Sequence, residues 1–193
     1  MEQHNEEIIK GEMVVLLEDE CHLLWGDVCG YVWGRRGEAI EVPMTNYRQR
    51  QTYYGAVNFV SREFHLQAFA AGDSGNTISY IKWLMQIYEG KRLLLVWDGA
   101  TYHRDQKMKE FLAEVNQGLA EEEFVVSLMA FAPHAPEQNP VEDVWLAGKN
   151  HLRRSFAVNK TFAQVKESFC SFLKSFFLES VKFDWYAPAV HLI

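Results

Sequence analysis

Short runs of apolar residues alternate with longer stretches of helical periodicity along this chain. Met13 to Leu17 and Leu93 to Trp97 are two such runs, each bounded by polar or charged residues. Runs of this length and composition are typical of strands buried on both faces of a sheet. Gln51 to Val60 and Glu63 to Ala70 are rich in aromatic and aliphatic residues and are joined by a short connection. They therefore predict two antiparallel neighbouring strands.

Helical spacing of apolar residues predicts helices over Asn76 to Tyr88, Arg104 to Gln117 and Thr161 to Phe177. A further strand is predicted over Phe124 to Phe131. A β-meander followed by helix, strand, helix and strand predicts a mixed sheet flanked by helices, with right-handed crossovers between parallel strands. This order of elements is similar to that of an RNase H-like fold, so the expected class is α/β with a mixed five-stranded sheet.

Asn139 and Pro140 mark the start of another helix, with asparagine as the cap and proline in the first turn. The residues at helical spacing that this helix should bury are Val141, Val144, Trp145, Gly148 and Leu152. An adjacent stripe carries Glu142, Lys149 and Arg153.

Three segments carry weaker signals. Residues 1–11 are polar and acidic, and we expect them to form a flexible lead-in to a single domain over residues 12–193. The glycines within Trp33 to Gly37 predict a hairpin turn, followed by a short strand at Ala39 to Val42. The tail from Lys182 to Ile193 contains aromatic residues but no periodicity that predicts an element.

The composition limits what the chain can do. With a formal net charge of −7, a surface that binds nucleic acid all over is excluded, and any DNA contact must be local. The three cysteines form no CxxC pair, which indicates a reducing compartment. A zinc site at Cys21, His22 and Cys29 is disfavoured because the spacing fits no common site. Neither a signal peptide nor an apolar run of membrane-spanning length is present, so we expect a soluble, cytoplasmic protein.

Three carboxylates lie at the ends of predicted strands or at the start of a predicted helix, where active sites of such folds are usually found. Asp19 follows the first apolar run, Asp98 follows the run that ends at Trp97, and Glu142 lies in the first turn of a late helix. Carboxylates that share a site repel one another unless a cation neutralises them, and oxygen ligands favour Mg²⁺ or Mn²⁺ over Zn²⁺. Two such ions would support phosphoryl transfer.

Each of these acids also has an ordinary structural interpretation. Asp19 could be a solvated strand end, Asp98 a turn residue, and Glu142 a partner of the helix dipole or of a capping box. In a strand, however, Asp19 points away from Glu18 and Glu20, so it can be the single ligand on its face. The joint placement of the three acids, each after a buried strand or a proline-containing loop, favours the functional interpretation.

The motifs around the three acids carry a family resemblance. The segments are Leu17-Glu-Asp-Glu20, Val96-Trp-Asp-Gly-Ala-Thr-Tyr-His103 and Ala132-Pro-His-Ala-Pro-Glu-Gln-Asn-Pro-Val-Glu-Asp-Val-Trp145. They resemble the three catalytic blocks of the DDE transposases of the mariner-like superfamily, in particular its bacterial insertion-sequence branch. The third segment is the most specific, because its combination of prolines, asparagine, glutamate and tryptophan is improbable by chance. The resemblance runs from about Met13 to near Arg154.

The resemblance implies an RNase H-like catalytic domain in which Asp19, Asp98 and Glu142 hold two Mg²⁺ or Mn²⁺ ions. Such a domain nicks transposon ends and joins the freed 3′-hydroxyl to target DNA. It therefore implies transposon-end and target DNA as partners, a homodimer assembled on DNA, a nucleoid association when bound, and no membrane.

Further candidate residues surround this triad. Glu20 and His103 are candidates for orienting the metal ligands without binding the metal themselves. The candidate contacts to DNA phosphates are Lys149, Arg153, Arg35 and Arg36. Ordinary solvated charge is the alternative for these basic residues, and a loop histidine with satisfied hydrogen bonds is the alternative for His103.

The chain departs from the family pattern in several places. His134 and Ala135 stand where an aromatic and a hydroxyl-bearing residue are common, and Gly99 stands where a small polar residue is common. The segment between the second and third acids is longer than is typical, with Gly118 to Glu123 as the expected insertion. No helix-turn-helix reader precedes the catalytic domain, so we expect one that is separately encoded or fused by a frameshift, unless the chain is a fragment. A nuclease that does not rejoin DNA and an inactive DNA-associated remnant remain alternatives.

Overall fold

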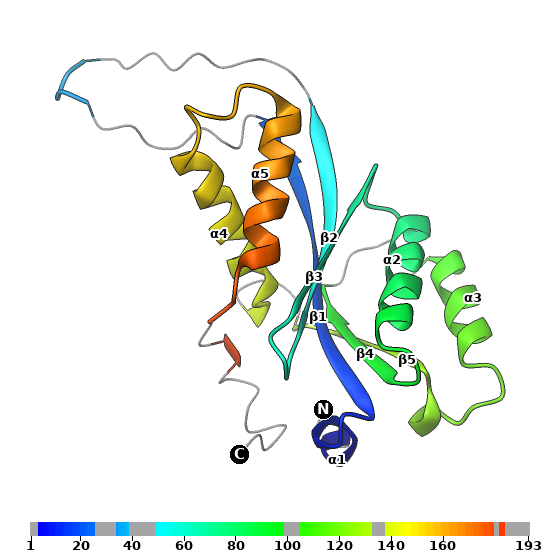
Figure 1. The fold of residues 1–193 in the computed structure, drawn as a ribbon. Coiled ribbons are helices and arrows are strands. Elements are labelled where there is room, and N and C mark those ends of the chain that lie inside the picture. The colour runs from blue at the N-terminus through cyan, green and yellow to red at the C-terminus, as the bar shows by residue number, and fades with distance from the viewer. Residues whose placement is uncertain are drawn as a thin grey trace.

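A five-stranded sheet with helices on both faces forms the centre of the computed structural model, which describes residues 4–25, 34–38, 49–98, 105–132, 138–179 and 182–183 (Figure 1). The strands are β1 (Met13–Leu24), β2 (Arg50–Asn58), β3 (Phe64–Phe69), β4 (Arg92–Trp97) and β5 (Val126–Ala130). Their order in the sheet is β3-β2-β1-β4-β5. β1, β2 and β3 form an antiparallel meander, while β4 and β5 extend the sheet from β1 in parallel. The predicted mixed sheet is therefore confirmed.

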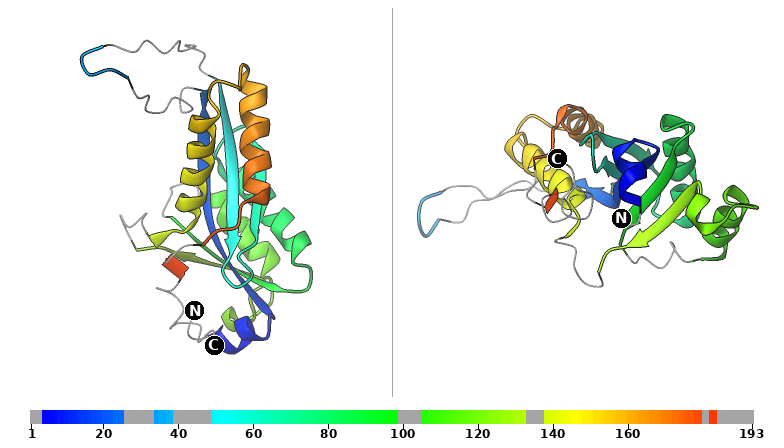
Figure 2. Two further views of the ribbon diagram at one scale, coloured as in Figure 1. Left: turned by 60° about the vertical axis from the view of Figure 1, so that its left-hand side comes forward. Right: turned by 90° about the horizontal axis from the view of Figure 1, so that it is seen from below.

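The helices form one layer on each face of the sheet (Figures 1 and 2). One layer holds α2 (Ser74–Ile87) and α3 (Gln106–Val115), and the other holds α4 (Val141–Arg154) and α5 (Phe162–Ser175). A short 3₁₀ turn, η4 (Glu121–Glu123), lies in the predicted insertion before β5. The helices end within a few residues of their predicted bounds.

Strand alternation divides the core into two halves. Leu16, Leu93 and Leu95 pack under α2 and α3, where Tyr80 and Phe111 complete the cluster. The neighbouring positions point to the other face, where Val15, Leu17, Leu94 and Val96 pack under Val144 of α4 and Phe169 of α5. Each residue of β1 therefore belongs to one helix layer or the other, and its parity decides which.

β1 is longer than the sequence predicted. The apolar run from Met13 to Leu17 was expected to end the strand, but β1 continues to Leu24. The continuation is held by β2, which pairs with β1 as far as Leu24 opposite Arg50. Asp19 therefore lies inside a strand, opposite Gly55, and not after its end.

The lead-in expected at residues 1–11 contains a short helix in its described part, and its flexibility stays a prediction. α1 (Asn5–Ile9) is helical, and Ile8 is buried against the core. Glu7 forms an ion pair with Arg92 of β4, and the carbonyl of Glu12 accepts a hydrogen bond from the N–H of Arg92. One buried apolar side chain and one partly buried ion pair hold a segment whose composition is otherwise polar.

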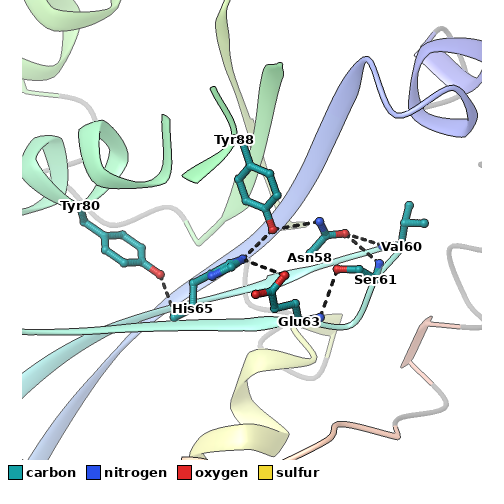
Figure 3. Close-up of polar contacts among 7 residues, drawn as sticks. All are labelled: Asn58, Val60, Ser61, Glu63, His65, Tyr80 and Tyr88. Atoms are coloured by element: carbon teal, nitrogen blue, oxygen red, sulfur yellow. Dashed lines mark hydrogen bonds and ion pairs between the residues drawn. The ribbon is translucent and has the colours of Figure 1, made fainter. Parts of the chain in front are cut away.

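A polar network ties the edge strand β3 to α2 (Figure 3). Nε2 of the buried His65 lies 2.6 Å from the hydroxyl of Tyr88, which also accepts a hydrogen bond from Nδ2 of Asn58 at 3.0 Å. The hydroxyl of Tyr80 donates to the carbonyl of His65 at 2.8 Å. Burial lowers the pKa of His65, while the nearby Glu63 carboxylate acts in the opposite direction. A neutral His65 can accept a hydrogen bond from the Tyr88 hydroxyl, so the network needs no added charge.

The predicted helix at Asn139 and Pro140 is confirmed as α4. The side chain of Asn139 accepts a hydrogen bond from the N–H of Val141 at 3.1 Å, as a cap does. The buried residues of α4 are those that the spacing predicted: Val141, Val144, Trp145, Gly148 and Leu152. Glu142 is exposed in the first turn of this helix.

Several predictions from the sequence lie outside the described residues. These are the strand at Ala39 to Val42, the loop from Gly99 to His103, the departures at His134 and Ala135, and most of the tail after Phe183. Of the predicted hairpin, residues 34–38 are described and form an exposed turn. No helix among the described residues is long and apolar enough to cross a membrane.

The two helices α4 and α5 approach closely at Gly148. A Cβ built on Gly148 would lie 2.5 Å from Cε2 of Phe169 and 3.1 Å from Cδ2 of Leu173. Phe169 is fully buried between α4 and the sheet, stacking on Trp145 with ring centroids 6.3 Å apart. The absence of a side chain at Gly148 therefore sets the distance between the two helices.

Gly148→Ala should lower the free energy of unfolding by about 1–3 kcal/mol, because the new methyl group overpacks the α4–α5 contact. This loss should appear even though alanine favours a helix over glycine by ~1 kcal/mol. Denaturant unfolding measures the change. Leu146→Ala, on the exposed side of the same helix, is the control and should change stability by no more than about 0.5 kcal/mol. Equal stabilities for the two variants would contradict the close approach.

Candidate active site

Asp19 and Asp98 lie on neighbouring parallel strands at matching positions. Leu17 of β1 pairs with Val96 of β4, and each aspartate lies two residues further along its own chain. Parallel strands in register place paired side chains on the same face, and Leu17 and Val96 both pack under α4 and α5. The two aspartates therefore follow strand positions that face this layer.

Glu142 reaches the same region from the first turn of α4. A buried asparagine makes the connection, because Nδ2 of Asn139 donates to the carbonyl of Glu18 in β1 at 2.9 Å. The start of α4 is thereby fixed to the strand position next to Asp19. Three acids from β1, the end of β4 and the start of α4 thus lie around one end of β4.

The electrostatics of Asp19 show how close these acids are. The pKa of the Asp19 carboxyl is raised to about 8, and burial is the largest cause. Repulsion from the carboxylates of Glu142, Glu20 and Asp98 contributes to this rise, in that order of size, whereas the N–H of Glu20 acts in the opposite direction. Asp19 is thus influenced by both other members of the predicted triad, although the positions of the three along the chain are far apart.

Trp145 contacts Asp19 directly, which the sequence had not indicated. Nε1 of the indole donates a hydrogen bond to Oδ2 of Asp19 at 3.1 Å. The indole can lie there because residue 55 has no side chain: a Cβ on Gly55 would be 2.5 Å from Cζ2 and Cη2 of Trp145. The only sequence signal was the spacing in α4. Trp145 lies one helical turn after Glu142, so it is close to this acid although its side chain is on the buried side of the helix.

Glu18 belongs to the opposite helix layer. It is 1% exposed, and neither of its side-chain oxygens has a hydrogen-bond partner among the described residues. Burial raises the pKa of Glu18 well above its usual range, and the charges of Glu20, Asp19 and Asp98 add to this. The parity that predicted Asp19, and not Glu18 or Glu20, as the acid on the α4 face agrees with this arrangement.

The remaining candidate residues are distributed along α4 and beyond it. Lys149 is half-buried and Arg153 is exposed on the stripe of α4 that begins at Glu142, and Arg153 donates to Oδ1 of Asn150 at 2.9 Å. Arg35 and Arg36 are exposed in the turn at 34–38, which lies away from the sheet and is not brought to the acids (Figure 1). His103 lies outside the described residues.

The acids suit a hard divalent cation in charge and in donor type. Among the described residues, no three His, Cys, Asp or Glu side chains lie close enough together to hold an ion as they stand. Three carboxylates repel one another, and a cation would remove this repulsion while accepting their oxygens as ligands. Burial and this repulsion together raise the pKa of Asp19, and a bound divalent cation would offset both. The residues therefore fit such an ion. Convergence of all three on one metal shell remains a prediction.

Comparison with known proteins places the chain in a family. Residues 14–164 match the family model described as DDE superfamily endonuclease. The chain belongs to the DDE superfamily endonucleases. It is thus a member of an enzyme family that acts on DNA with divalent metal ions, and the match includes all three acids of the predicted triad.

Solved structures of related fold agree with this assignment. The Mos1 transposase paired-end complex with left transposon end is 11% identical, with a TM-score of 0.58 over 98% of this chain and 57% of that chain. The Mos1 mariner paired-end complex with Mg has 13% identity and a TM-score of 0.59, covering 92% and 51%. The simian T-cell lymphotropic virus intasome has 11% identity and a TM-score of 0.56, covering 86% and 50%.

These likenesses show the fold, which is RNase H-like as the order of elements predicted. This endonuclease chain spans about half the length of the solved chains that it matches. No curated protein sequence matches it.

The raised pKa of Asp19 should make the metal-free endonuclease less stable as pH rises. Below its unfolded-state pKa of about 4, Asp19 is protonated in both states and contributes no pH dependence. Between that value and about 8, the folded state holds a proton that the unfolded state has lost, so stability falls as pH rises.

Asp19→Asn removes this penalty. In the presence of a chelator, the melting temperature of the variant relative to that of wild type should increase as pH rises from 5 to about 8. Mn²⁺ should then stabilise wild type more at pH 8 than at pH 6, because the ligand must lose its proton. A difference between the two proteins that does not change with pH would contradict the raised pKa.

Trp145→Phe keeps most of the ring but removes the N–H that Asp19 accepts. The pKa of Asp19 should rise further and Mn²⁺ affinity should fall by about 10–100-fold, as is typical when a partner of a metal ligand is lost. Titration calorimetry with Mn²⁺ measures the affinity. Trp83→Phe, the same change on α2, is the control. Equal Mn²⁺ affinity in both variants would show that the indole only fills space.

Proposed function

We propose that this endonuclease domain performs metal-dependent cleavage and strand transfer at transposon ends. The observation that carries the proposal is the influence of Glu142 and Asp98 on the carboxyl of Asp19, which supports one shared site built from three acids. The resemblance of the three motifs to DDE transposases and the family match support the same reaction.

Asp19, Asp98 and Glu142 would hold two Mg²⁺ or Mn²⁺ ions. When bound, such ions activate a water or a 3′-hydroxyl and stabilise the oxygen that leaves phosphorus. The protein supplies the geometry. Trp145 holds one oxygen of Asp19 through its indole N–H. Asn139 holds α4 against β1, so that Glu142 approaches Asp19 from the first turn of α4. Glu20 and His103 remain candidates for supporting these ligands.

The outer stripe of α4 supplies a path for the DNA backbone. Lys149 and Arg153 lie roughly 10 and 16 Å from Glu142 along the helix axis, from a rise of about 1.5 Å per residue. Each strand of a duplex has one phosphate per about 3.4 Å of duplex axis. With α4 parallel to that axis, these residues would meet phosphates about three and five nucleotides from the cleaved bond. A local basic stripe of this kind is compatible with the acidic net charge of −7. Arg35 and Arg36 would contact DNA further away.

The partners follow from the reaction. Transposon-end DNA and target DNA are the substrates, and a homodimer assembled on DNA would join two ends. The Mos1 complexes, one with left transposon end and one described as a strand transfer complex, support this set of partners. A separately encoded or frameshift-fused helix-turn-helix domain would recognise the ends, and the assembly would act in the cytoplasm on the nucleoid.

Asp98→Asn should reduce Mn²⁺-dependent cleavage of DNA that carries the terminal repeats beside this gene by at least about 100-fold. Loss of a metal ligand removes several kcal/mol of transition-state stabilisation, and each ~1.4 kcal/mol corresponds to a factor of ten. Gel analysis of end-labelled DNA measures cleavage, and Glu114→Gln on α3 is the control for loss of one negative charge.

Pre-nicked transposon ends test the second step. Joined products with wild type, but not with Asp98→Asn, are the expected result. Cleavage without joining would indicate a nuclease. If wild type and Asp98→Asn show the same absence of Mn²⁺ binding and of cleavage, the proposal is wrong and the chain is an inactive remnant.

A further inference from the structure

The first turn of α4 is held by one buried residue, Asn139, whose side chain and carbonyl group are both hydrogen-bonded. Its side chain donates to the carbonyl of Glu18 at 2.9 Å and accepts from the N–H of Val141 at 3.1 Å. Its carbonyl accepts from the N–H of Glu142 at 3.3 Å and from Nζ of Lys182 at 3.2 Å. A residue near the far end of the chain therefore shares an acceptor with the backbone of Glu142.

Lys182 holds this turn at a second point. Its ammonium group lies 2.9 Å from Oδ1 of Asp143, the residue that follows Glu142. The side chain of Lys182 is only 13% exposed and that of Asp143 is 36% exposed, so the pair is more shielded than an ordinary surface ion pair. Lys182 thus links Asn139, which precedes α4, to Asp143, which follows the proposed metal ligand Glu142.

Apolar contacts determine where Lys182 stands. Phe183 is 2% exposed and packs on Phe59 with ring centroids 6.0 Å apart. The guanidinium of Arg62 lies 3.4 Å above the same ring, with Arg62 itself in the left-handed region at φ 64°. Leu178, before Lys182, is also buried in the core beneath α4 and α5. In Figure 1 the short red segment at 182–183 lies beside the yellow end where α4 begins.

A lysine is an unusual choice for this position. The amino end of a helix carries a partial positive charge, so a cation there does not stabilise the helix. Burying the ammonium also removes most of its water. The lysine is explained if its task is to hold Asn139 and Asp143 in place, and to offset the charge of Asp143 beside a cluster of acids.

We propose that Lys182 is a positioning residue for the metal site, an inference that rests on the proposed function. It acts through the Asn139 carbonyl and the Asp143 carboxylate to fix the first turn of α4, and so sets the distance of Glu142 from Asp19. Lys182 touches neither DNA nor metal in this role. It contributes by orienting the ligand Glu142, as do other groups that contact metal ligands without contacting the metal.

Lys182→Met tests this role, because methionine retains the length of the side chain and removes its charge and donors. Lys174→Met, at an exposed position in the last turn of α5, is the matched control. Mn²⁺ affinity is measured by titration calorimetry on the full chain without DNA. Single-turnover cleavage at several Mn²⁺ concentrations, affinity for uncleaved end DNA and melting temperature complete the set.

We expect Lys182→Met to weaken Mn²⁺ binding about 10-fold and to slow cleavage about 10–100-fold at limiting Mn²⁺, with DNA affinity unchanged. Excess Mn²⁺ should restore much of the rate. Asp143→Asn, which keeps an acceptor for Lys182, should show a smaller change in the same direction, and it decides the question if Lys182→Met does not fold. A merely structural role would lower the melting temperature and leave the Mn²⁺ affinity of the folded protein unaltered.

The inference is overturned if wild type binds Mn²⁺ and cleaves DNA while Lys182→Met, or Asp143→Asn in its place, matches Lys174→Met in Mn²⁺ affinity. That result would leave the proposed function intact. Failure of the proposed function has a different signature, because wild type itself would then neither bind Mn²⁺ nor differ from Asp98→Asn.

Discussion

The parallel pairing of β1 with β4 determines where the proposed active site lies. The pairing ends at Leu17 and Val96, while β1 continues along β2 for several more residues. Asp19 therefore has a paired strand on one side and the end of β4 on the other. Asp98 leaves the sheet at this point, and α4 brings Glu142 to it through Asn139. Each later contact in the site depends on the register of these two strands.

The acids of the proposed site reduce the electrostatic stability of the folded protein. Asp19 lies among like charges, and Glu18 is buried with no hydrogen-bond partner for either side-chain oxygen in the described part of the chain. Such groups reduce stability unless they are neutralised. The surrounding packing offsets the cost: Trp145 fits over Gly55, and α5 approaches α4 at Gly148. Tight packing around the acids supplies stability, while the acids are the proposed catalytic groups, a division common in enzymes.

Local patterns were sufficient to predict the five strands and the helices α2 to α5, but not the helix α1 or the full length of β1. The buried face of α4 follows from spacing alone, and the end of β4 at Trp97 follows from a short apolar run. Contacts between distant segments could not be predicted in this way. The bond from Trp145 to Asp19 joins residues 126 positions apart, and the length of β1 depends on pairing with β2 beyond the apolar run. Ile8 and Lys182 belong to polar or aperiodic segments, so their roles become visible only from what they touch.

The position of Asp19 within a paired strand has a consequence for how the length of this chain can vary. Successive residues of β1 alternate between the two helix layers, so the loss or gain of one residue between Met13 and Asp19 would turn the aspartate toward α2 and bring Glu18 or Glu20 to α4. Between β4 and α4, by contrast, η4 and its flanking turns lie outside the sheet and can accept added residues. Sequences of this type are thus free to change length after the second acid and are fixed in length before the first.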